Sequence, residues 1–80
     1  MLTKEDKANL INIAMQAEAE CYNRYFMSAA ADILKKYAKK HGIDYLMNFL
    51  RMATPITSKL YLEFCYLGRD AIRQSISFTV

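Results

Sequence analysis

The first 41 residues of this 80-residue chain contain neither glycine nor proline, so no strong helix breaker interrupts them. Thr3 is a good N-cap, and Asp6 stands three residues later, near the capping-box position. Gly42 is a natural stop. A single helix from about residue 3 to 41 would be roughly 57 Å long, whereas a compact chain of this length is about 30 Å across. The segment therefore either breaks or extends beyond one globule into a dimer.

The apolar stripe of this segment changes sides near residues 20–25. In the second half, the apolar residues share one face around Ile33 and Leu34. Continued backwards, that face meets polar residues such as Asn12 and Gln16. Either the helix is interrupted there, or one long helix packs against different partners on its two halves. We favour an interruption or kink, although no glycine or proline marks its position.

Two further helices are expected after the glycine. Asp44 can cap a short helix over about 44–53, and this stretch is apolar on nearly every side, which is typical of a buried helix. Thr54 and Pro55 match an N-cap followed by proline at the first helical position. They predict a third helix over about 55–75.

The fold class that follows is all-α. We expect residues 1–80 to form a single helical domain, a three- or four-helix bundle whose long N-terminal helix, about 3–41, is either continuous or kinked. Hydrophobic residues make up 54% of the chain, which is high for a small globule and predicts self-association or a partner surface. Residues 1–20 are acidic and residues 21–52 are basic, so two chains could pair through them. A homo-oligomer, most simply a dimer, is therefore expected.

The start of the chain is charged and lacks the apolar run of a signal peptide. No apolar stretch approaches the roughly 18–20 residues that span a bilayer. We therefore expect a cytoplasmic protein without a membrane association. Cys21 and Cys65 are then more consistent with free thiols than with a disulfide.

Catalytic, metal and cofactor chemistry is not expected. The two cysteines and His41 are widely spaced and match no metal-site pattern or catalytic signature. Glu18 and Glu20 would point to different sides of a helix, which does not suit a paired-carboxylate site. The sequence contains no glycine-rich phosphate loop.

Residues 37–52 show part of the pattern of a helix-turn-helix, with an alanine and a turn glycine four residues later. Asn48 and Arg51 fall where that motif usually has buried aliphatic residues, so sequence-specific DNA binding is disfavoured. A lysine-rich helix face could still bind phosphates without reading bases, although the solvated end of an amphipathic helix has the same composition. The residues of this polyanion-binding alternative are Lys35, Lys36, Lys39, Lys40, Arg24 and Arg51.

Apolar residues outside the expected core favour a protein-binding surface. Leu62 and Tyr66 lie one turn apart on the charged side of the last predicted helix, where the neighbouring charges oppose full burial. A second strip, with Met15, Tyr22 and Phe26, suits core and interface equally. We therefore expect a small, non-enzymatic binding protein that modulates or inhibits a larger protein partner by surface docking. Its size also fits an accessory protein of a virus or mobile element, and the alternative function is nucleic-acid binding.

Overall fold

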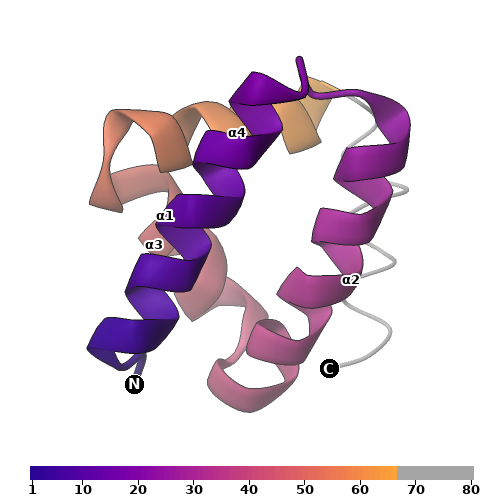
Figure 1. Ribbon diagram of the computed structural model, residues 1–80. Coiled ribbons are helices and arrows are strands. Elements are labelled where there is room, and N and C mark those ends of the chain that lie inside the picture. Colours follow the sequence, from indigo (N-terminus) through magenta and orange to yellow (C-terminus); the bar gives the residue numbers. More distant parts are fainter. Residues whose placement is uncertain (67–80) are drawn as a thin grey trace.

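The computed structural model describes residues 1–66, and within them the chain forms four α-helices and no β-strand (Figure 1). The helices are α1 (Lys4–Ala19), α2 (Arg24–His41), α3 (Ile43–Ala53) and α4 (Pro55–Tyr66). The predicted all-α bundle of three or four helices is confirmed. Thr3 caps α1 through a capping box, as its position before Asp6 predicts.

The N-terminal segment breaks between α1 and α2, which confirms the interruption indicated by the change of apolar face. The end of α1 is a Schellman motif. The backbone N–H of Tyr22 donates to the Ala17 carbonyl at 2.8 Å, and that of Cys21 donates to the Glu18 carbonyl at 3.0 Å. Cys21 and Tyr22 adopt the left-handed conformation, with φ of 55° and 54°, although neither is a glycine.

Asn23 restarts the helix after this turn. Its side-chain Oδ1 accepts a hydrogen bond from the backbone N–H of Phe26 at 2.8 Å, which makes it the N-cap of α2. The turn folds α2 back beside α1, and the longest dimension of the molecule is only 29 Å. Because the segment breaks and fits within one globule, the length of residues 3–41 is not evidence for a dimer.

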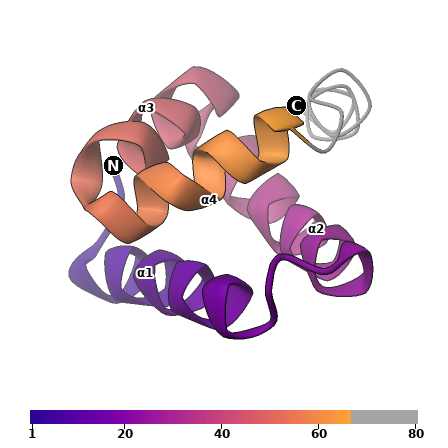
Figure 2. The same cartoon turned by 90° about the horizontal axis from the view of Figure 1, so that it is seen from above.

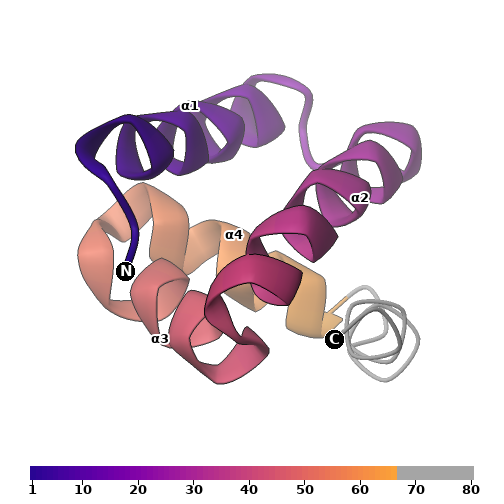
Figure 3. The ribbon, with the colours of Figure 1, turned by 90° about the horizontal axis from the view of Figure 1, so that it is seen from below.

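Helix α4 lies between α1 and α3, as the views from above and below show (Figures 2 and 3). Helix α2 packs against α3 and, through fewer contacts, against α1. The small residues Ala14 and Ala17 form the buried side of α1 together with Leu10, so the backbone of α1 can lie close to its neighbours. The core residues that are fully buried or nearly so include Leu10, Met27, Leu34, Leu46, Leu50, Thr57 and Leu60.

Single residues join the last three helices. Gly42 links α2 to α3 with φ of 93° and ψ of 139°, a conformation that favours glycine. Thr54 links α3 to α4 and exchanges hydrogen bonds with Thr57. The Thr54 hydroxyl accepts from the Thr57 backbone N–H at 3.1 Å, and the Thr57 hydroxyl accepts from the Thr54 N–H at 3.0 Å. This reciprocal pair satisfies the backbone at the start of α4.

The prediction that residues 44–53 form a buried helix is correct for only one side of α3. Leu46, Met47 and Leu50 are buried, but Tyr45 is 41% exposed and Met52 is 69% exposed. The reason is that α4 covers one side of α3 and leaves the opposite side open. The last helix begins at Pro55 as predicted, and the predicted part after Tyr66 lies outside the described residues.

Candidate interaction surfaces

Lys59 joins α4 to the end of α1. Its Nζ donates to Glu18 Oε2 at 3.3 Å and lies 5.6 Å from the centroid of the Tyr22 ring. The hydrogen bond to Glu18 raises the pKa of Lys59, and burial raises the pKa of Tyr22. Within the described residues, the buried Tyr22 hydroxyl has no hydrogen-bond partner. Tyr22 therefore holds the α1–α2 turn against α4 by packing and by its contact with a cation.

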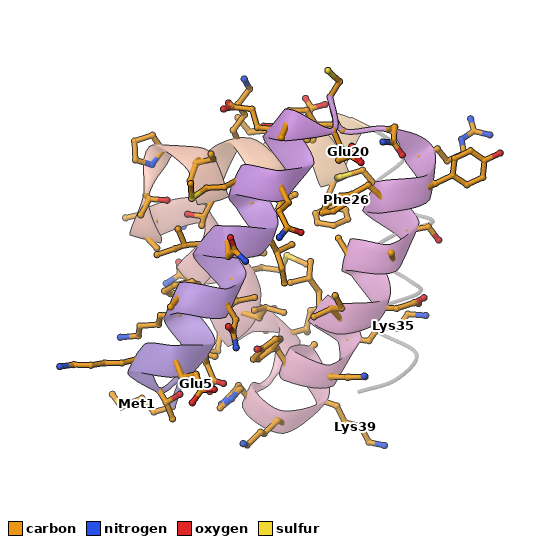
Figure 4. The ribbon with its side chains drawn as sticks, in the orientation of Figure 1. Met1, Glu5, Glu20, Phe26, Lys35 and Lys39 are labelled. Carbon is orange, nitrogen blue, oxygen red and sulfur yellow. The ribbon has the colours of Figure 1, made fainter. Side chains whose placement is uncertain are left out.

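The predicted protein-binding residues divide into two groups. Met15 on α1 is 54% exposed and Leu62 on α4 is 48% exposed. Tyr22 and Phe26 are only partly buried and pack against the core, and Figure 4 shows Phe26 pointing from α2 toward α1. Tyr66 is the last residue of α4, and its side chain lies outside the described part. Among the four members whose side chains are described, Met15 and Leu62 are the ones that present apolar surface to solvent.

The lysine-rich face occupies the C-terminal half of α2. Lys36, Lys39 and Lys40 are exposed, and Lys35 Nζ lies 3.5 Å from Asp32 Oδ1 on the same helix. Figure 4 shows that Lys35 and Lys39 extend outward from this half of α2. The two predicted arginines lie elsewhere: Arg24 is the first residue of α2, and Arg51 belongs to α3. The face is therefore a lysine cluster about two turns long.

Helices α2 and α3 and the glycine between them are the segment that resembled a helix-turn-helix. Asn48 and Arg51 are both exposed on α3, so the motif lacks the buried positions that it usually has there. The Arg51 guanidinium also donates a hydrogen bond to Asn48 Oδ1 at 3.3 Å, through Nη2 only. This geometry does not favour α3 as a reading helix.

His41, at the end of α2, forms a small polar cluster with the start of α1. Its imidazole is only 5% exposed and lies between the rings of Tyr37 and Tyr45, with centroid distances of 6.5 and 6.3 Å. Nε2 is 3.8 Å from Asp6 Oδ2, which is too long for a hydrogen bond but close enough for attraction when the imidazole is protonated. Asn9 extends the cluster, because its Nδ2 lies 3.5 Å from the Tyr37 hydroxyl.

The outer side of α3 is a surface that the sequence did not reveal. We define the α3 face as Asp44, Tyr45, Asn48, Arg51 and Met52, all of which are exposed. Shallow grooves flank it on both sides. One groove is lined by Tyr45, Asn48, Phe49, Met52 and Ala53, and the other by Asp44, Met47, Asn48, Arg51 and Tyr61. The sequence signal for this exposed side is the helical spacing of its polar residues, Asp44, Asn48 and Arg51, which are four and three positions apart.

Among residues 1–66, no group of three or more His, Cys, Asp or Glu side chains is arranged to hold a metal ion. No helix in that part of the chain is long and apolar enough to cross a membrane. No protein-family model, curated protein or solved structure matches this chain significantly.

Proposed function

We propose that this chain is a small, non-enzymatic binding protein that modulates or inhibits a larger protein partner by surface docking. The observation that supports the proposal is the amount of apolar surface that the core leaves exposed. Large apolar side chains are at least 40% exposed on all four helices. They are Met15 on α1, Tyr25 and Ile33 on α2, Tyr45 and Met52 on α3, and Leu62 on α4.

Leu62 is the position at which we expect the partner to dock. It lies one turn after Lys59 on α4, beside the charged junction with α1. Leu62 is 48% exposed, so a partner that covers it completely gains about half of the roughly 1.5–3 kcal/mol expected for a fully exposed leucine, while the neighbouring charges supply a polar rim.

The test is capture of partners from a nuclease-treated lysate of the source cells by the wild type and by Leu62→Asp. We expect at least one protein to bind the wild type and to be lost with Leu62→Asp, with helical circular dichroism unchanged. Ser28→Asp, at an exposed position on α2, adds the same charge elsewhere and should retain the protein. If both variants capture the same proteins as the wild type, docking at Leu62 is wrong.

The second candidate is phosphate binding by the lysine cluster, which is favoured by the exposure of Lys36, Lys39 and Lys40 within two turns. Three phosphate contacts would weaken duplex binding about 40-fold between 50 and 200 mM salt. Charge reversal at Lys36 and Lys39 should remove that binding in a fluorescence-anisotropy titration. Absence of binding to duplex DNA or RNA at low salt would exclude this candidate.

A further inference from the structure

We propose that the α3 face binds the same face of a second copy of this chain, with the two α3 helices antiparallel around a two-fold axis. The face combines exposed apolar side chains, Tyr45 and Met52, with one acidic residue and one basic residue. Asp44 lies near the start of α3 and Arg51 near its end. Within the described residues, neither Asp44 nor Arg51 forms an ion pair.

The two-fold symmetry determines which residues meet. In such a pair, residues on one side of α3 face the residues on the same side of the partner helix, in reversed order. Tyr45 and Met52 share one side, so the Tyr45 ring of each copy meets Met52 of the other. Asp44 and Arg51 share the other side, so each carboxylate meets a guanidinium. Both pairings are centred next to Asn48, which lies in the middle of the face.

Each pairing is favourable by its chemistry. A methionine sulfur beside an aromatic ring is attractive, and Met and Tyr bury large apolar areas when they pack. An Arg–carboxylate pair is the ion pair with the best geometry for two parallel hydrogen bonds. The Tyr45 ring is also held in place before association, because its hydroxyl accepts a hydrogen bond from the backbone N–H of Leu2 at 3.4 Å. The symmetric arrangement doubles every contact.

The expected affinity is modest. Helix α3 has 11 residues, so one helix from each copy forms a contact about 16 Å long. Interfaces of this size fall below the standard range and are weak or transient. We therefore expect a dissociation constant of about 10–1,000 µM. This inference does not depend on docking at Leu62, because α3 and α4 present different residues.

The test is analytical ultracentrifugation of the full chain from about 10 µM to 1 mM, the range that the expected affinity requires. The wild type should shift from monomer to dimer with concentration. Met52→Asp should remain monomeric, since it places a carboxylate against the partner's ring. Asp44→Arg and Arg51→Asp should each weaken the dimer by about tenfold or more, because both symmetric ion pairs become like-charge pairs.

The decisive variant carries both changes in one chain. Asp44→Arg with Arg51→Asp regenerates the two ion pairs in reversed order, so it should restore the dimer to within about threefold of the wild type. Reversed charges also oppose the helix dipole by about 0.3–1 kcal/mol each, so helicity and melting temperature are measured for every variant. A charge swap that folds and does not restore the dimer overturns the proposal, as does a wild type that stays monomeric.

Two matched controls separate this surface from the others. Met15→Asp introduces the same change at another exposed methionine, on α1, and should leave the dimer unaffected. Leu62→Asp should lose the captured partner and keep the dimer, and Met52→Asp should do the reverse. Loss of the dimer in Met15→Asp or Leu62→Asp, with Met52→Asp still dimeric, would show that a different face associates.

Discussion

Asp6, in the first turn of α1, contacts both Thr3 and His41, the last residue of α2. Its Oδ2 accepts a hydrogen bond from the backbone N–H of Thr3 at 3.2 Å, and the Thr3 hydroxyl accepts from the Asp6 N–H at 3.0 Å. The same carboxylate faces the buried imidazole of His41. The Thr3 backbone hydrogen bond is the main cause of a pKa below the ordinary value of 3.8, and the nearby charges of Lys40 and His41 act in the same direction.

We expect Asp6→Asn to lower stability at neutral pH and to make the acid side of the pH–stability curve flatter. A carboxyl whose pKa is lower in the folded state than its ordinary 3.8 stabilises the fold fully above that value. This contribution disappears as the pH falls through the folded-state pKa. Urea unfolding between about pH 2 and pH 7 measures the difference between wild type and variant across that window.

The matched control is Glu5→Gln, which removes a charge from the same turn without changing the capping box. It should alter stability less than Asp6→Asn. A stability difference between wild type and Asp6→Asn that stays constant down to the lowest pH would contradict the role assigned to the carboxylate.

At the scale of the elements, the single-residue links determine how the helices meet. Gly42 has nothing within 4 Å of the position that a Cβ atom would occupy, so space does not restrict this site. Its φ of 93° does restrict it, because L-residues with a side chain rarely adopt that conformation. A side chain at this position that forced the link into another backbone conformation would move α3 relative to α2 and disturb the packing around Leu46.

We therefore expect Gly42→Ala to destabilise the fold by about 1–3 kcal/mol, measured by chemical unfolding followed by circular dichroism. Ala29→Gly, at an exposed position within α2, is the comparison and should cost about 1 kcal/mol through helix propensity alone. Wild-type stability in Gly42→Ala would mean that the link relaxes to an ordinary backbone conformation.

Several helix boundaries could be predicted because they depend on short-range interactions. Thr3, Gly42 and the Thr54–Pro55 pair each act through their own backbone or a hydrogen bond three residues away. The break between α1 and α2 could be located only approximately, because Cys21 adopts the left-handed conformation without being glycine. The available signal was Asn23, a strong N-cap residue.

The surfaces were harder to predict than the boundaries. Phe26 and Tyr22 lie on a strip whose burial depends on how α2 folds back beside α1, and the apolar pattern alone does not contain that information. In α3, apolar residues occur on nearly every side, so the exposed side is decided by where α4 packs. Sequence patterns thus identified the helices, and tertiary packing selected which residues remain at the surface.

At the scale of the whole molecule, α4 connects the parts of the bundle. It packs against α3, its neighbour in sequence, and against α1, which lies at the other end of the described chain. The contact between Lys59 and Glu18 spans 41 residues. The α2–α3 and α3–α4 contacts, by contrast, form across links of one residue each.

These links have a kinetic consequence. Loop closure costs more entropy for distant contacts, so we expect α3 to pair with α4 in the folding transition state before α1 docks. Leu50→Ala should then slow folding, whereas Leu10→Ala should mainly accelerate unfolding. Both leucines are fully buried, so each substitution should lower the free energy of unfolding by about 2–5 kcal/mol. Folding and unfolding rates are measured by stopped flow on the Met52→Asp background, which avoids self-association.

If both variants slowed folding equally, α1 would already be docked at the barrier. If Leu10→Ala instead mainly accelerates unfolding, α1 is the last helix of the described chain to pack during refolding and the first to detach during unfolding. Transient opening of the native protein would then begin at α1, and backbone amides there would exchange with deuterium sooner than those of α3 and α4.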